Sequence, residues 1–237
     1  MGKARTFFGL AAAVALSAGA LLAATGAAVG APNDKVDITI CHANNDVKKP
    51  YVEETPANEG QLSAHVNHTG PVFNAANPPE PQDGWGDIIP PFGDGELANG
   101  LNWTPGGQAI WENGCEIPFG DVVVHKDVVD TGSLEAAGQT YSIHLTCDFE
   151  GSNVLDETVS LAGGTSTDAF TDVQGGTICD ATEDTTGIAN LASSVTNGPI
   201  TVAGDTTNTV IVTNTYNTPA PEPEAAAAVR APARFTG

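Results

Sequence analysis

The sequence predicts a mainly β protein, with a C-terminal immunoglobulin-like β-sandwich preceded by a small, loop-rich, disulfide-stabilised α+β module. Two observations favour this fold class. Residues 119–217 are rich in Thr, Val, Gly and Asp, whereas residues 32–118 are loop-rich and contain all three tryptophans. The strand-like runs of the second block are 121–129, 140–149, 155–161, 166–173, 176–183, 199–203 and 208–216. Short runs separated by glycine-containing turns are typical of such a sandwich.

The two ends of the chain are expected to lie outside the folded part. Residues 1–31 have the organisation of a secretory signal peptide, with Lys3 and Arg5 before an apolar stretch and small residues after it. Residues 218–237 are rich in Pro and Ala and predict a disordered tail. No stretch after the signal is long and apolar enough to cross a bilayer. We therefore expect a secreted protein that is extracellular or loosely associated with the cell wall.

The charge of the chain excludes one class of partner. There are 29 acidic and 8 basic residues, a formal net charge of −21. That total includes Lys3 and Arg5, so cleavage of the signal would make the charge −23. A surface this acidic repels phosphate backbones, so nucleic-acid binding is excluded and an extracellular ligand or cell-envelope component is the expected partner.

The first module has few regular elements. We expect a strand over 36–40, a second strand over 50–54 and a short helix over 61–68. The rest is dominated by prolines and glycines, which predict loops. A core of this size depends on its aromatic residues and on a disulfide.

The cysteines predict two disulfides. All four follow the signal peptide, and an even number in a secreted chain is typical of disulfide pairing. Four cysteines allow three pairings. Cys41–Cys115 with Cys147–Cys179 is favoured because each pair then stays within one block.

Lys126 is the only lysine or arginine between Pro50 and Val229. Strand alternation over 121–129 places it on the same face as three valines, where an unpaired ammonium would be costly. Three interpretations are open. The amine could form a salt bridge with Glu183 or Asp127, it could reach water from an edge strand, or it could react with a neighbouring group.

The same alternation test brings two other polar residues toward the interior. Asn214 shares a face with the apolar residues of 208–216, and Glu183 shares one with Cys179 and Ala181. A sandwich interior could thus hold Lys126, Glu183 and Asn214 together. Burial would lower a lysine pKa and raise a glutamate pKa, which favours a neutral amine beside a protonated acid.

These residues carry a family resemblance. A first strand with Val-x-Lys126, a late Thr-Glu183 and the closing Val-Thr-Asn214-Thr-Tyr resemble the B-type repeat domains of Gram-positive collagen adhesins and pilins. The block as a whole resembles a domain of unknown function from secreted proteins of high-GC Gram-positive bacteria. The resemblance implies a β-sandwich with a spontaneous isopeptide bond, in which Lys126 is the nucleophile, Asn214 the electrophile and Glu183 the proton shuttle. Such a reaction is a single self-modification rather than enzymatic turnover.

Three histidines form the second candidate site. His65 and His68 are three residues apart and would share a helix face, and with His42 they could bind zinc or copper. Alternatively, they only form hydrogen bonds within a loop-rich fold. If Cys41 and Cys115 were free thiols, a Cys/His zinc site would be favoured instead. The surrounding sequence resembles an uncharacterised secreted Cys-His…His-x-x-His…Cys module, which implies no activity.

The functional prediction follows from these two candidate sites and from the absence of sequence motifs typical of enzymes. The sequence contains no nucleophile elbow, phosphate loop or calcium loop, so we expect no enzyme. The favoured function is an extracellular or cell-surface structural or adhesive protein with a disulfide- and isopeptide-stabilised sandwich. The alternative is an extracellular zinc- or copper-binding protein that uses His42, His65 and His68.

Overall fold

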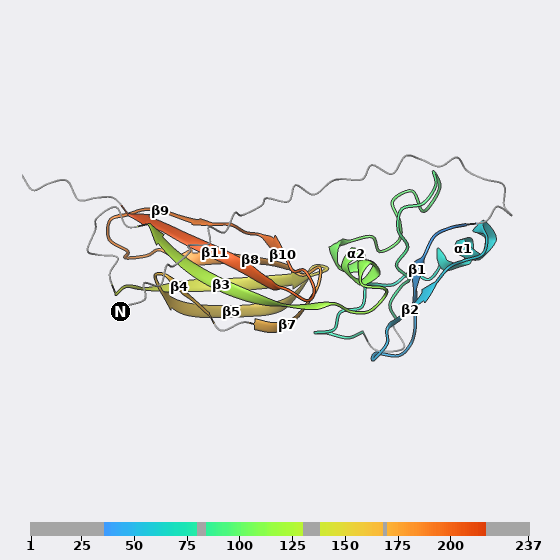
Figure 1. Ribbon diagram of the computed structural model, residues 1–237, viewed down its shortest axis with the longest axis horizontal. Coiled ribbons are helices and arrows are strands. Elements are labelled where there is room, and N and C mark those ends of the chain that lie inside the picture. The colour runs from blue at the N-terminus through green and yellow to red at the C-terminus, as the bar shows by residue number, and fades with distance from the viewer. Residues whose placement is uncertain (1–35, 80–83, 130–137, 168–169, 217–237) are drawn as a thin grey trace, which may run out of the picture.

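The computed structural model describes residues 36–79, 84–129, 138–167 and 170–216 (Figure 1). The predicted signal peptide and C-terminal tail lie outside these residues. The described part is mainly β, with a sandwich and a smaller module side by side along the long axis of the molecule. None of its helices is both long enough and apolar enough to span a bilayer.

The sandwich consists of two sheets. One has the strand order β10-β8-β4-β5, with bounds Ile200–Thr201, Ile178–Asp184, Thr140–Phe149 and Ser152–Ala162. The other has the order β6-β3-β11-β9, with bounds Thr165–Ser166, Phe119–Val129, Thr207–Tyr216 and Leu191–Thr196, and β7 (Phe170–Gln174) also pairs with β3. The predicted run 166–173 therefore corresponds to two strands, and β9 was not predicted.

Alternating side chains form the core between the sheets. Every second residue is buried throughout β4 and from Val210 onward in β11, which is the pattern that places one face of each strand against the opposite sheet. The core residues from β3 and β11 are Val122, Val124, Val210 and Val212, and those from β4 and β8 are Ile143, Leu145, Cys147, Cys179 and Ala181. The predicted sandwich is thus confirmed.

The first and last long strands of the sandwich are neighbours. β3 and β11 run parallel over nine paired residues, from Thr207 opposite Asp121 to Thr215 opposite Val129. In this register Lys126 lies opposite Val212, and Asn214 lies two residues further along β11. Because side chains alternate with period two, Lys126 and Asn214 project from the same face of one sheet.

The first module contains β1 (Ile40–Ala43) and β2 (Tyr51–Glu54) as an antiparallel pair, with helices α1 (Glu59–His65) and α2 (Pro105–Glu112). The strand expected over 36–40 begins only at its last residue, and the helix expected over 61–68 begins and ends earlier. Helix α2 was not predicted. Thr104 caps it by accepting a hydrogen bond from the backbone N–H of Gly107.

Both predicted disulfides are present. Cys41–Cys115 connects β1 to the segment after α2, and Cys147–Cys179 joins directly opposite residues of β4 and β8. The first bridge lies in a core of aromatic side chains that includes Trp85 and Phe73. No free cysteine remains among the described residues.

Gln174, at the end of β7, connects the sandwich to the first module. Its Oε1 accepts a hydrogen bond from the backbone N–H of Ala75 at 2.8 Å, and its Nε2 donates to the backbone carbonyl of Phe73 at 2.9 Å. Only 6% of Gln174 is exposed, so water cannot replace these bonds. The two parts of the chain are therefore joined by specific hydrogen bonds as well as by the polypeptide.

We expect Gln174→Ala to loosen this junction. The change leaves the backbone N–H of Ala75 and the backbone carbonyl of Phe73 without the hydrogen bonds that the Gln174 side chain makes to them. This loss should lower the free energy of unfolding by about 1–3 kcal/mol. Amide hydrogen exchange at Ala75 should accelerate in the variant. In the control Gln108→Ala, which removes one hydrogen bond to Trp103 inside the first module, exchange at Ala75 should be unchanged. Equal exchange in both variants would contradict the proposed role of Gln174.

Candidate crosslink and metal sites

Lys126 is completely buried. It lies in β3 between β6 and β11, and none of its surface is exposed. The interpretation in which its head reaches water from an edge strand is therefore wrong. The Asp127 side chain belongs to the exposed face of the same strand, as expected from the alternation.

Glu183 and Asn214 surround the lysine amine. Nζ of Lys126 is 3.3 Å from Oε1 and 3.5 Å from Oε2 of Glu183, which reaches across the sandwich from β8. The amide nitrogen of Asn214 donates to the same Oε1 at 3.0 Å. The Asn214 residue is fully buried and the Glu183 side chain is 1% exposed. One carboxylate oxygen thus contacts both the amine and the carboxamide.

The environment of the amine disfavours its charged form. Burial lowers the pKa of Lys126, and the negative charge of Glu183 opposes this effect. Nζ also donates to the backbone carbonyl of Val212 at 3.3 Å and lies 4.6 Å from the centroid of the Tyr141 ring. The surroundings therefore favour release of a proton from the ammonium.

Only one of the two polar atoms in the Asn214 carboxamide has a hydrogen-bond partner. Its nitrogen is hydrogen-bonded, but its Oδ1 is buried with no hydrogen-bond partner. Buried polar atoms are rarely left unpaired, because the lost hydration is not replaced. Ser194 in β9 donates to Oε2 of Glu183 and helps to fix the carboxylate. Glu183 contacts both the Lys126 amine and the Asn214 carboxamide, which is a position from which a carboxylate can carry a proton between the two groups.

The three predicted histidines also come together. Their ring centroids lie 5.0, 5.1 and 5.4 Å apart in pairs. His42 comes from β1, His65 from the last turn of α1 and His68 from the segment after it. The expected helix face does not extend to His68, because α1 ends at His65. Tertiary contacts rather than helical spacing bring His68 to the other two rings.

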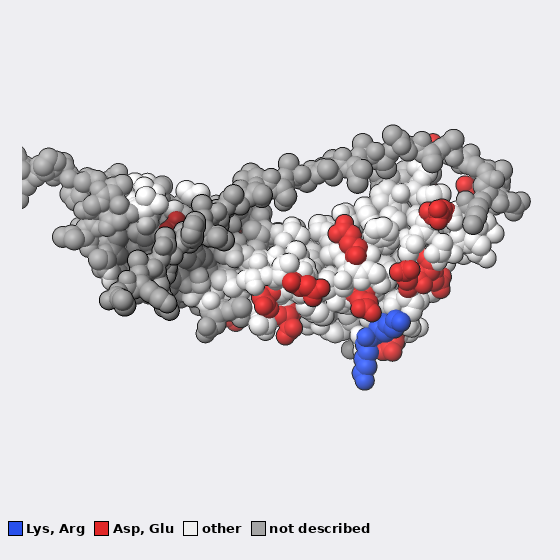
Figure 2. Space-filling view, viewed as in Figure 1, with Lys and Arg blue, Asp and Glu red and all other residues white. Residues whose placement is uncertain are grey.

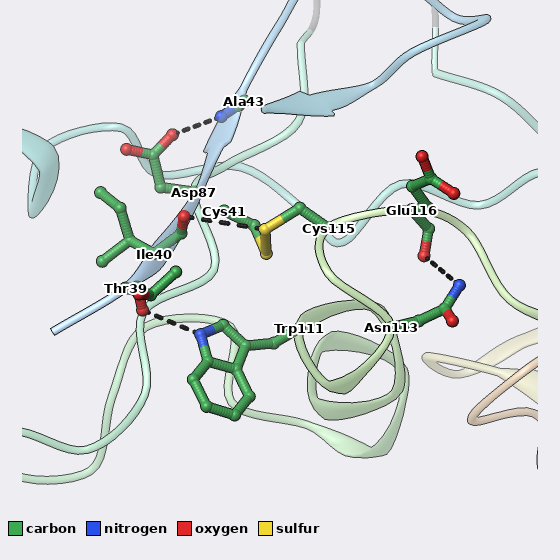
Figure 3. The surroundings of a disulfide bond; sticks show 9 residues. All are labelled: Thr39, Ile40, Cys41, Ala43, Asp87, Trp111, Asn113, Cys115 and Glu116. Atoms are coloured by element: carbon green, nitrogen blue, oxygen red, sulfur yellow. Dashed lines mark hydrogen bonds between the residues drawn. A yellow bond between two sulfur atoms is a disulfide. The ribbon is translucent and has the colours of Figure 1, made fainter. Parts of the chain in front are cut away.

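Asp87 is the residue of this cluster that the sequence analysis missed. Its fully buried carboxylate lies against all three histidines: Oδ2 is 3.2, 2.7 and 3.1 Å from Nδ1 of His42, His65 and His68. Its other oxygen, Oδ1, accepts a hydrogen bond from the backbone N–H of Ala43 at 2.7 Å (Figure 3). One ligand atom from each of these four side chains falls within 4.8 Å of the others, a spacing that could hold a metal ion.

The backbone around this cluster is tightly packed. Cys41 and Ile88 exchange two hydrogen bonds of 2.9 Å, which fixes the residues next to His42 and Asp87 side by side. The backbone N–H of Asp87 donates to the carbonyl of His68 at 2.9 Å. Because Cys41 is bonded to Cys115 (Figure 3), the Cys/His zinc site considered above is not formed.

Acidic side chains outnumber basic ones on the surface that can be described. Figure 2 shows them spread over the face in view, while basic side chains are confined to one place. Lys48 and Lys49 are the exposed lysines of the described residues, because Lys126 is buried. The prediction that nucleic acid is not a partner rests on this distribution of charge.

We expect Gly86→Ala to disrupt the histidine cluster. A Cβ atom at position 86 would lie 2.5 Å from the backbone nitrogen of Gly70 and 2.7 Å from the carbonyl of His68, so the two segments would have to separate. The expected cost is about 1–3 kcal/mol, measurable by thermal unfolding. Gly95→Ala is the control, because its Cβ meets nothing within 4 Å. Equal stability of the two variants would disprove the close approach.

Comparison with known proteins finds a family model that is similar to part of the chain. Residues 122–217 match the family model described as a domain of unknown function, DUF5979. No curated protein matches the chain.

Three similar solved structures are adhesins or pilins. A bacterial adhesin from Mobiluncus mulieris containing intramolecular disulfide, isopeptide and ester bond cross-links is 15% identical with a TM-score of 0.32, over 42% of this chain and 42% of that one. A pilus-presented adhesin is 12% identical with a TM-score of 0.30, over 41% and 27% of the chains. The major pilin T-13 of Streptococcus pyogenes is 14% identical with a TM-score of 0.27, over 42% and 46%. The chain spans less than half the length of each, and residues 122–217 are similar to the DUF5979 family.

Proposed function

We propose that this chain is a secreted, non-enzymatic structural or adhesive protein of the extracellular space or cell surface, whose sandwich is locked by an isopeptide bond between Lys126 and Asn214. The observation that carries the proposal is the group of Lys126, Glu183 and Asn214, buried together between the sheets. The signal-like residues 1–31 and the acidic surface support an extracellular location. An extracellular ligand or a cell-envelope component is the proposed partner.

The proposed reaction follows from the contacts of Glu183. The carboxylate accepts a proton from the Lys126 ammonium, and the neutral amine attacks Cγ of Asn214. As the C–Nδ2 bond of Asn214 breaks, Glu183 gives the proton to the departing nitrogen, which lies 3.0 Å from its Oε1. The products are a secondary amide and ammonia, and no oxidant or cofactor is consumed. Glu183 then takes up the second proton that the attacking nitrogen loses, so it ends the reaction protonated, and its lost negative charge balances the lost positive charge of Lys126.

The fold explains why such a bond would matter for a structural protein. Lys126 and Asn214 belong to adjacent parallel strands that begin and end the sandwich. A covalent bond between them would close a loop that contains nearly the whole sandwich. In the chain-entropy account of crosslinks, a loop of this length contributes about 4.6 kcal/mol. The acidic surface would keep such a protein soluble outside the cell.

Intact mass spectrometry of the secreted chain tests the crosslink. After reduction of both disulfides, the measured mass should be lower than the mass calculated from the amino-acid sequence by that of one ammonia molecule. Asn214→Ala and Lys126→Met should each show their full calculated masses. Glu183→Gln should also show its full calculated mass, because the side-chain amide of the introduced glutamine cannot carry the proton. Protease digestion of the wild type should give a branched peptide that joins the segments around residues 126 and 214.

A matched control separates the reacting carboxamide from other asparagines of β11. Asn208 lies on the same strand but donates to backbone carbonyls, including that of Asp121 at 3.1 Å. Folded Asn208→Ala protein should therefore still lose ammonia. Wild-type protein that is folded, with circular dichroism typical of β structure, and that has its full mass would refute the isopeptide and leave a buried ion pair.

The pH dependence of stability gives an independent test. In Asn214→Ala the amine stays free, with a pKa below its usual 10.5 because of burial. Between the folded pKa and 10.5 the unfolded chain binds more protons than the folded chain, so this variant gains stability as the pH rises toward 10.5. The crosslinked wild type has no amine at this position.

We therefore expect the difference in unfolding free energy between the wild type and Asn214→Ala to narrow as the pH is raised from neutrality, measured by denaturant unfolding. The double variant Lys126→Met/Asn214→Ala is the control, since it has neither crosslink nor amine, and its difference from the wild type should stay constant. A difference between the wild type and Asn214→Ala that does not change with pH would indicate that the wild type also keeps a free amine and has no crosslink.

A further inference from the structure

We propose that the first module binds one zinc ion through His42, His65, His68 and Asp87. The assignment is independent of the crosslink, because the four residues lie in a different part of the chain. It extends the predicted three-histidine site by a fourth ligand, Asp87. The spacing between Asp87 and the histidines in the sequence is not that of a known metal motif.

The distances from Asp87 to the three histidines are close to those between ligands of a tetrahedral metal site, and all four ligand atoms lie within 4.8 Å of one another. Zn²⁺ binds nitrogen and oxygen ligands at about 2.0–2.1 Å, so two ligands of a tetrahedral ion lie roughly 3.3 Å apart. Oδ2 of Asp87 is 3.2, 2.7 and 3.1 Å from the three Nδ1 atoms. All three histidines present the same ring atom to this oxygen, although they come from separate segments.

The surrounding groups are those that support metal ligands. Histidine ligands commonly donate their second ring nitrogen to a carboxylate, which fixes the tautomer and the ring orientation. Nε2 of His65 lies 3.5 Å from Oε2 of Glu54, while its Nδ1 faces Asp87. The backbone N–H of Ala43 holds the second oxygen of Asp87 at 2.7 Å (Figure 3). Nδ1 of His65 and Oδ2 of Asp87 therefore remain as the atoms that would bind the ion.

The chemistry of the donors favours zinc over other ions. Three imidazoles and one carboxylate suit a borderline divalent ion, whereas Ca²⁺ and Mg²⁺ require oxygen ligands. Cu²⁺ prefers a square-planar arrangement, and binding of copper alone is an outcome that the test below separates from zinc binding. The described cysteines are all in disulfides and offer no thiolate. A complete set of four protein ligands is typical of structural rather than catalytic zinc.

The position of the site indicates what the ion would do. It would connect β1, α1, the segment after α1 and the segment of Asp87, in a module with little regular secondary structure. The binding free energy of such an ion contributes directly to folding, since the unfolded chain has no formed site. The His68 side chain is 47% exposed, so an ion can enter from solvent without unfolding the module.

The test uses the mature, untagged chain with both disulfides intact, freed of metal with a chelator. Titration with zinc sulfate, followed by calorimetry, should show one equivalent bound and a higher unfolding temperature. Cobalt chloride should give the visible absorption of a tetrahedral ion. His68→Asn removes the most exposed ligand and should weaken zinc binding by at least about 100-fold while the circular dichroism is unchanged.

His144→Asn is the matched control. His144 also contacts a carboxylate, with its Nε2 2.6 Å from Oδ1 of Asp156, but this pair is exposed on the sandwich and has no further histidine. This variant should bind zinc as the wild type does. No zinc binding by the wild type, equal binding by His68→Asn, or binding of copper alone would each overturn the assignment. The histidines would then only form hydrogen bonds with Asp87.

Discussion

The sandwich depends on the burial of one primary amine between its sheets. An ammonium group cannot remain in such a place without compensation, because the loss of hydration is far larger than any single contact provides. The compensation comes from the opposite sheet, where the Glu183 carboxylate accepts from Lys126, Asn214 and Ser194. These contacts link β3, β8, β9 and β11. The polar group therefore fixes the relative positions of two sheets that valines alone would hold less specifically.

The two parts of the molecule are stabilised in different ways. The sandwich has long strands and a continuous apolar core, with Cys147–Cys179 joining two strands that are already paired. The first module has two short strands and two short helices, and its Cys41–Cys115 bridge spans 74 residues of chain. A bridge across a long loop restricts the unfolded chain more than one between neighbouring strands. The stability of the first module thus depends more strongly on its disulfide than that of the sandwich does.

Much of the sandwich could be predicted from the sequence, because strand alternation directly encodes which side chains face the core. The same rule placed Lys126, Glu183 and Asn214 in the interior. It could not reveal that β3 and β11 are parallel, since pairing depends on the whole topology. Helix α2 was missed because Gly106 and Gly107 weaken its propensity. Asp87 was missed because long-range hydrogen bonds, not sequence spacing, bring it to the histidines.

The parallel pairing of β3 and β11 has a mechanical consequence. The chain enters the sandwich at Phe119, the start of β3, and leaves it at Tyr216, the end of β11. Tension applied along the polypeptide pulls these two strands in opposite directions along their length, so their inter-strand hydrogen bonds bear the load together instead of opening one by one. This shear geometry resists extension, and a covalent link from Lys126 to Asn214 would carry the force past all the residues between them.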